Sequence, residues 1–327
     1  MNNLEKQKSL KKKYKRSIIN LGNSKAITFP QDWTNIAKLK AKSEVALYPL
    51  DDKTLVVQSA DSKQRKTVFR LDASEWPMNL LRQAIISAFK LNVDEIYIKF
   101  NKQNQDDLYA QLIELRKEII GLDFKILDTQ EFYVNFLLDS KKTDVPEVLS
   151  DLTHVFTSII SNLLKGTIKK NNEMLLAEID RKYSLGTRIL ITGLSEYPIS
   201  SGYRKFPIIR FLGDRVILLY IRDFINEALN LQHIPEQIID KYSQILKTVS
   251  ELLKEIVNNY QKIDLNAISN FQSELKKLCD SLQDTDYKED HQEEIQLRDI
   301  IKYFLNGFRN FFDIGITRLI EKEIGMI

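Results

Sequence analysis

The spacing of hydrophobic residues divides this 327-residue chain into three parts, each of which predicts a different kind of structure. Residues 16–58 alternate short β-branched or aromatic runs with turn residues, which is typical of small hairpins. Residues 66–137 alternate strand-like runs with amphipathic helical patterns. From residue 144 onward, apolar residues recur at helical spacing almost to the end of the sequence. We therefore predict a multidomain protein with a β unit, a small α/β segment and an all-α C-terminal part.

The first part is predicted to hold two β-hairpins. Gly22-Asn23-Ser24 separates the first two strands, because a Gly-Asn pair supplies the positive φ that a tight hairpin turn needs. Pro30 ends the second of these strands. The predicted elements are strands at 17–20, 26–29, 45–48 and 54–58 and a short helix at 31–37. Two hairpins of this length cannot bury a core alone, so a second copy of the chain is expected to complete the unit.

The second and third parts are predicted to contain the long helices. The α/β segment should place two helices against one sheet, and it contains no Gly-rich phosphate loop. Its predicted strands are 67–71, 95–100, 123–127 and 132–136, with helices at 77–90 and 106–120. The last part is predicted to form six helices at 146–165, 172–192, 207–232, 235–261, 265–282 and 292–323.

Two segments of the helical part resemble each other at an offset of 87 residues. Residues 221–229 and 308–316 both read apolar, Arg, Asx, Phe, apolar, Asx, any residue, small, apolar. The offset is the length of about three helices with their links. It therefore predicts two three-helix bundles that are related by duplication.

Charge changes the picture of the N-terminal part. The net charge is only +3, but residues 1–42 hold eleven Lys and Arg against Glu5 and Asp32, a local +9 that leaves −6 for residues 43–327. Residues 1–15 show no helical apolar face and are expected to be a flexible basic arm, for which a solubilising tail is the alternative reading. Beside a two-fold β unit, this arm would gather positive charge on one surface, which favours contacts to the phosphates of double-stranded DNA. The candidate DNA-binding residues are Lys11, Lys12, Lys13, Lys15 and Arg16 in the arm, with Asn23 and Lys25 at the hairpin tip.

The hairpin part resembles a known family of DNA-binding domains. The residues that carry the resemblance are Gly22, Ser24, Ala26, Phe29-Pro30 and Val45, with Trp33, Leu39-Lys40 and Glu44 in the expected order. Over residues 16–58 the chain is similar to the AbrB/SpoVT/MazE domain, although Ala41-Lys42-Ser43 stands where many members have Gly-Asp. In that family two chains interlace their hairpins into one dimeric barrel. The resemblance implies a homodimer that is joined through the N-terminal hairpins and binds DNA.

The two similar helical segments resemble the PhoU family, whose tandem three-helix bundles carry an acidic motif in the third helix. When the segments are aligned on their small residues, the family's glutamate positions are Arg222 and Arg309 and its aspartate positions are Asn226 and Asp313. Asp180 looks like the acidic position of the middle helix in the first bundle. An arginine repels a cation, so we predict no metal site here, but an arginine paired with a facing carboxylate. No cofactor is predicted.

Together the two resemblances divide the chain into a basic arm at 1–15, a swapped-hairpin domain at 16–58, an α/β coupling segment at 66–137 and PhoU-like bundles at 144–327. This order is similar to archaeal phosphate-uptake regulators. It implies a transcription regulator of phosphate uptake or homeostasis, whose partner is a phosphate-transporter ATPase or a kinase. Two alternatives stay open: a helical-bundle adaptor that touches nucleic acid incidentally, and a weakly specific architectural DNA-binding protein.

Other classes of protein are not favoured by the sequence. It shows neither the order of a Ser-His-Asp triad nor a Gly-x-Ser-x-Gly elbow, so no enzyme is predicted. A single cysteine, Cys279, excludes an internal disulfide, and three scattered histidines show no zinc-site spacing. No apolar run reaches the roughly 18 residues that span a bilayer, and none follows the basic N-terminal residues. We therefore expect a cytoplasmic protein without membrane insertion.

Overall fold

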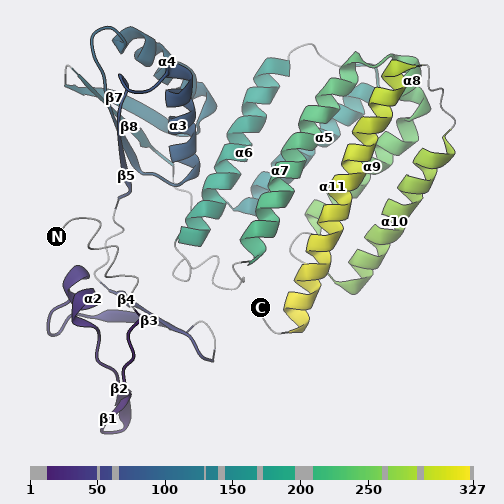
Figure 1. Ribbon diagram of the computed structural model, residues 1–327. Helices are drawn as coiled ribbons and strands as arrows, with labels where there is room; N and C mark the ends of the chain where they lie inside the picture. Colours follow the sequence, from purple (N-terminus) through teal and green to yellow (C-terminus); the bar gives the residue numbers. More distant parts are fainter. Residues whose placement is uncertain are drawn as a thin grey trace. The chain divides into compact units, whose positions relative to one another are not determined.

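A computed structural model divides the chain into two compact units, residues 1–65 and residues 66–327 (Figure 1). The structure describes residues 13–49, 52–60, 66–128, 130–138, 144–167, 172–195, 209–259, 264–285 and 291–324.

The first unit contains two separate two-stranded sheets. β1 (Ile19–Leu21) pairs antiparallel with β2 (Ser24–Ala26), and β3 (Val45–Pro49) pairs antiparallel with β4 (Leu55–Ser59). A short helix, α2 (Gln31–Ile36), separates the two hairpins in sequence. The predicted hairpins and short helix are confirmed, although β1 and β2 lie closer to the turn than predicted. Within the described residues of this one chain, the two sheets do not close into a barrel.

The second unit begins with a four-stranded sheet in the order β5-β6-β8-β7, in which only β5 and β6 are parallel. Helices α3 and α4 cover one face of the sheet, where the apolar side chains of both layers form one buried core (Figure 1). The elements are β5 (Val68–Asp72), α3 (Met78–Lys90), β6 (Glu95–Lys99), α4 (Gln105–Glu118), β7 (Leu122–Asp128) and β8 (Glu131–Phe136). The predicted alternation of strands and helices is therefore confirmed.

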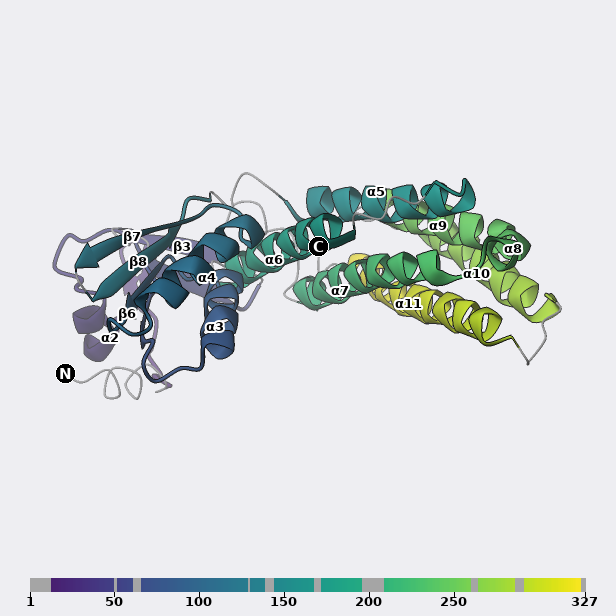
Figure 2. The same cartoon turned by 90° about the horizontal axis from the view of Figure 1, so that it is seen from above.

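The rest of the second unit is helical, which confirms the predicted all-α part. Its longer helices are α5 (Val145–Leu164), α6 (Asn172–Ser195), α7 (Ile209–Asn230), α9 (Ser243–Asn258), α10 (Leu265–Asp284) and α11 (Gln292–Glu323). Helices α5, α6 and α7 pack on one another, and so do α9, α10 and α11. Helix α5 also contacts α9, and α7 contacts α11, so that one hydrophobic core runs through both groups (Figures 1 and 2).

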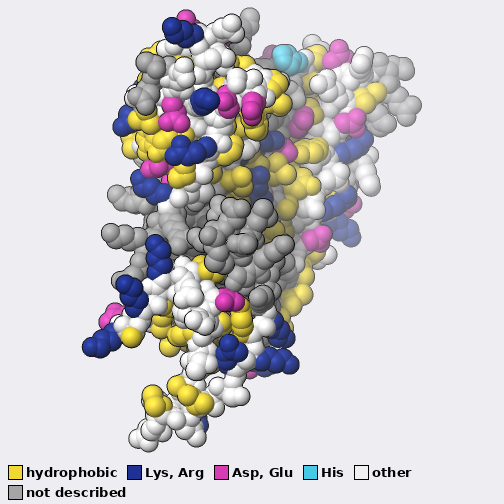
Figure 3. Space-filling model, turned by 60° about the vertical axis from the view of Figure 1, so that its left-hand side comes forward, with side chains coloured by type: hydrophobic (Ala, Val, Ile, Leu, Met, Phe, Trp, Pro, Cys, Tyr) yellow, Lys and Arg dark blue, Asp and Glu magenta, His cyan; other side chains and the backbone are white. Residues whose placement is uncertain are grey.

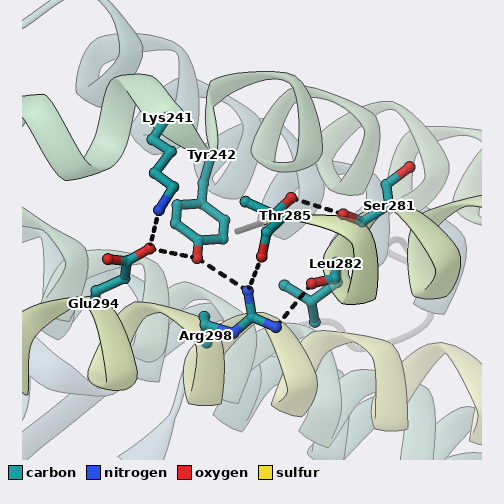
Figure 4. A network of polar contacts seen from close by, with 7 residues as sticks. All are labelled: Lys241, Tyr242, Ser281, Leu282, Thr285, Glu294 and Arg298. Atoms are coloured by element: carbon teal, nitrogen blue, oxygen red, sulfur yellow. Dashed lines mark hydrogen bonds and ion pairs between the residues drawn. The ribbon is translucent and has the colours of Figure 1, made fainter. Parts of the chain in front are cut away.

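One predicted helix is corrected by the structure. The segment predicted as a single helix over 235–261 is divided at Tyr242 into α8 (Glu236–Lys241) and α9. The buried Tyr242 hydroxyl donates to Glu294 at 2.8 Å and accepts from Arg298 at 3.0 Å, while Lys241 donates to the same Glu294 oxygen at 2.5 Å (Figure 4). Arg298 also donates to the carbonyl oxygens of Leu282 and Thr285. This network joins the break to the start of α11 and the end of α10, and such tertiary contacts leave no trace in apolar periodicity.

Candidate nucleic-acid interface

The β1–β2 turn exposes the residues predicted to reach DNA. Leu21 pairs with Ser24, which leaves Gly22 and Asn23 as a two-residue loop. Gly22 has a φ of +59°, whereas Asn23 is not among the residues with positive φ. A single positive φ at the first central residue is the pattern of a type II′ hairpin turn. The positive φ predicted for the Gly-Asn pair is thus supplied by Gly22, and the turn needs glycine only at position 22.

Lys25 is held beside an amide on the same hairpin. The two-residue turn places Asn20 directly opposite Lys25, and the Lys25 ammonium donates to Asn20 Oδ1 at 2.5 Å. Both side chains are exposed. Sequence reasoning did not single out Asn20, but a two-residue loop fixes the register and would have identified it as the cross-strand partner of Lys25. The hairpin therefore presents a cation and an amide together, two groups that suit phosphates or base edges.

The described end of the basic arm is connected to α2. The Tyr14 hydroxyl donates to Asp32 Oδ2 at 2.9 Å, and the Arg16 guanidinium lies 5.7 Å from the centre of the Tyr14 ring. Lys13, Lys15 and Arg16 are exposed, whereas Lys11 and Lys12 lie outside the described residues. Among the described residues, no hydrogen bond or ion pair joins these three cations to the hairpin tip.

The basic residues of this unit have few carboxylate partners. Lys13, Lys15, Arg16 and Lys25 form no ion pair with any carboxylate that the structure describes. Asp32 is already a hydrogen-bond acceptor of Tyr14. Positive charge in the unit is consequently available to an external anion such as a phosphate.

The first unit has no buried core of its own. None of its described residues is buried, and several large apolar side chains are more than half exposed. These are Ile18 and Leu21 at 69%, Leu47 at 55%, Leu55 at 54%, Ile27 at 53% and Ile19 at 51%. Apolar side chains on the protruding β1–β2 hairpin are visible at the foot of Figure 3. Exposed apolar surface of this extent is typical of surfaces that contact another surface.

Arg222 and Arg309 have partners other than those that the sequence predicts. Arg222 pairs with Asp223, its neighbour on the same helix, at 2.7 Å. Arg309 donates to Asn306 at 2.9 Å and lies 3.8 Å from the Cys279 sulfur. Within the described parts of the chain, neither arginine has the predicted carboxylate on a facing helix; the facing neighbour is Tyr183 for Arg222 and Cys279 for Arg309.

Other classes of site are not found in the described part of the chain. It contains no group of three or more His, Cys, Asp or Glu side chains that could hold a metal ion. None of its helices combines the length and apolar character needed to cross a bilayer. Comparisons with family models, with curated proteins and with solved structures find no match for this chain.

Proposed function

We propose that the chain is a homodimeric DNA-binding transcription regulator, in which the N-terminal hairpins of two copies interlace and the helical part senses a signal or docks a partner. The observation that supports this most is the first unit itself, a set of folded hairpins without a single buried residue in its described part. An isolated unit of this kind is not expected to be stable in water.

A second copy is the partner that fits best. β1–β2 and β3–β4 are two-stranded sheets, so each of these strands has one edge that pairs with no other described strand. Interlacing with another copy would pair those edges and bury the exposed leucines and isoleucines of both hairpins. This is the arrangement that the resemblance to the AbrB/SpoVT/MazE domain implies.

DNA is the ligand that the charges favour. The exposed cations of the arm and of the hairpin tip have no carboxylate partner among the described residues, and a two-fold axis would double them on one surface. The arm would supply phosphate contacts, while Asn20, Asn23 and Lys25 would supply contacts at the groove.

The helical part fits a duplicated, PhoU-like pair of three-helix bundles. The two groups of three helices follow each other in the chain and share one core. Phosphate uptake or homeostasis as the regulated process, with a transporter ATPase or a kinase as partner, follows from the resemblance alone and is part of the proposal.

Binding of the intact chain to duplex DNA tests the proposal. We expect binding at low salt and a preference for some sequences over random DNA. Asn23→Ala and Lys25→Gln should weaken the preferred site more than random duplex, since one good base contact discriminates by about 1 to 3 kcal/mol. Lys117→Gln, an exposed lysine on α4, is the control and should bind like the parent.

Two results would replace the proposal with an alternative. If the intact chain binds no duplex at low salt, the helical-bundle adaptor is the better account. If it binds all sequences equally, the chain is an architectural DNA-binding protein.

A further inference from the structure

Three cationic side chains from two layers of the second unit surround one tyrosine ring. The Lys90 ammonium at the end of α3 lies 5.3 Å from the centre of the Tyr183 ring on α6. The guanidinium carbons of Arg215 and Arg222 on α7 lie 5.0 and 4.5 Å from the same point. No two of the three charges can therefore be further apart than about 10 Å, and salt screens charges that are partly buried less than exposed ones. We call Lys90, Arg215 and Arg222 the Tyr183 cluster.

The cluster holds more positive than negative charge. Among the described residues, Lys90 has neither a hydrogen bond nor an ion pair, and Arg215 donates only to the Thr187 hydroxyl at 2.6 Å. Arg222 pairs with Asp223, and Asp180 is the carboxylate that attracts Lys90 from α6. Among the residues that the structure describes, two carboxylates thus accompany three cations, which leaves an excess of one positive charge.

A nearby arginine, Arg188, has backbone acceptors for its guanidinium at this junction. Arg188 on α6 is buried, unlike the three half-buried cations of the cluster, and its Nη1 donates to the carbonyl oxygens of Phe89 and Val93 at 2.7 and 3.2 Å. These carbonyls lie at and just beyond the C-terminal end of α3, where a cation is favoured. Arg188 therefore serves the packing of α3 on α6, whereas the Tyr183 cluster has no comparable set of acceptors.

The pKa of Lys90 reflects the repulsion within the Tyr183 cluster. Burial lowers its pKa, and the charges of Arg215 and Arg222 lower it further, while Asp180 acts in the opposite direction. A half-buried lysine usually has a partner, because the chain otherwise loses hydration without an equivalent interaction. A cluster that repels itself in the free protein is the arrangement expected where an external anion supplies the missing charge.

We propose that the Tyr183 cluster binds a small oxyanion, either free phosphate or the phosphate group of a small ligand. Two guanidinium forks and one ammonium are the donors that recognise phosphate oxygens. The Tyr183 ring is only 4% exposed and cannot stack on a base, so the charged group itself is the recognised feature.

A bound anion would affect the structure, because the three side chains come from different layers. Lys90 belongs to the α/β layer, while Arg215 and Arg222 belong to the helical part. An anion held by all three would replace repulsion between the layers with attraction and strengthen their contact. If the chain is the regulator proposed above, this junction is where its helical part reads a signal; the binding itself does not depend on DNA.

Thermal unfolding of the full chain in an oxyanion-free buffer tests the proposal. At constant ionic strength set with chloride, inorganic phosphate should raise the unfolding temperature of the parent, because a ligand that binds only the folded state stabilises it. Lys90→Gln and Arg215→Gln should each weaken the apparent phosphate affinity at least tenfold. Arg215→Lys, which keeps the charge but not the fork, should retain part of the response. Lys302→Gln, an exposed lysine on α11, is the control and should respond like the parent.

A second readout separates binding from a structural role. Without phosphate, Lys90→Gln and Arg215→Gln should be at least as stable as the parent, because each removes repulsion, whereas structural cations would destabilise the chain when neutralised. A phosphate response equal in all variants, or destabilisation of both glutamine variants without phosphate, would overturn the proposal.

A nucleotide that shifts the unfolding temperature of the parent at lower concentration than phosphate would identify a phosphorylated ligand as the source of the oxyanion. The reverse order would identify free phosphate. If neither ligand shifts the parent, the proposal is wrong, and DNA binding remains a separate question.

Discussion

Phe224 of α7 and Phe311 of α11 lie 87 residues apart in the chain, and their ring centres are 5.9 Å apart. The two residues occupy the same position in the two similar segments, so the duplicated pattern brings equivalent side chains together. Equivalent residues of a repeat can touch only near the axis that relates the two copies. The contact therefore supports the proposed duplication more strongly than the sequence match alone.

Gly307 leaves room for the Phe224 ring, and its replacement is predicted to destabilise the fold. It is the position equivalent to Tyr220, and an added Cβ would overlap the Phe224 ring and lie 3.0 Å from Tyr220 Cδ1. Gly307→Ala should reduce the free energy of unfolding by about 1 to 3 kcal/mol, although alanine favours the helix by about 1 kcal/mol. Chemical denaturation measures the change. Gly213→Ala is the matched control, since its Cβ would lie 3.1 Å from the movable Ile314 side chain and 4.0 Å from Arg318 Nη2, without overlapping a ring. An equal loss in both variants would contradict this account.

Glu294 should make the helical part sensitive to acid. Burial raises its pKa, but hydrogen bonds from Lys241 and Tyr242 outweigh burial and hold the pKa below its ordinary value of 4.5. The stabilisation is therefore complete above pH 4.5 and is lost as the pH falls through the lower pKa of the folded state. Glu294→Gln should cost roughly 1.5 to 3 kcal/mol at neutral pH, the range for hydrogen bonds to a charged group.

The pH dependence of Glu294→Gln, compared with that of the parent, tests whether the charge of Glu294 is the cause. The difference in unfolding free energy between the parent and Glu294→Gln should shrink as the pH is lowered from 6 to 3. A difference that stays constant over this range would show that folding does not shift the pKa of Glu294, and would contradict this account.

Arg188 is predicted to connect the α/β layer to the helical part. Its guanidinium donates to two carbonyl oxygens at the end of α3 and lies 4.9 and 5.2 Å from the ring centres of Phe89 and Phe136. Burial lowers its pKa to about 10, so it is charged at neutral pH. Arg188→Met should remove a donor from both carbonyls, of which Phe89 keeps the Asn92 N–H at 3.1 Å, and cost about 1 to 3 kcal/mol. In Arg188→Met, hydrogen exchange should show that α3 loses protection before α9. Arg116→Met, which removes an exposed ion pair with Asp123, is the control and should not show this loss.

The order of elements could be predicted from the sequence because it depends on local patterns. The helices of the C-terminal part and the strand–helix alternation of the α/β layer follow directly from apolar spacing. The break at Tyr242 could not be predicted, since it depends on Glu294 and Arg298 from a distant helix. The partners of Arg222 and Arg309 were missed for the same reason.

The candidate site was predictable only in part. The Gly22-Asn23 turn marked the hairpin tip, and the charge count marked the basic arm. The Tyr183 cluster brings together residues from positions 90, 215 and 222, which share no motif and meet only through packing of α3, α6 and α7.

Dimer formation is predicted to depend on the apolar side chains of the hairpins. Leu47→Ser combined with Leu55→Ser should shift the full chain from dimer to monomer, because both side chains are more than half exposed in the single chain. Light scattering measures the mass. Leu80→Ser, at a side chain of α3 that is 50% exposed, is the control and should remain dimeric. Deletion of residues 1–58 should also give a monomer, and a deleted chain that stays dimeric would place the interface on the helices instead.

The salt dependence of DNA binding tests the central claim most directly. Lys11, Lys12, Lys13 and Lys15 are changed together to glutamine, and the affinity for one duplex is measured from low to high salt beside the parent. If the arm contacts phosphates, the slope of log affinity against log salt should become flatter by up to about 0.9 for each contact removed, for every DNA sequence alike. An unchanged slope, with the affinity of the parent at all salt concentrations, would contradict the claim that this unit binds DNA through its basic arm.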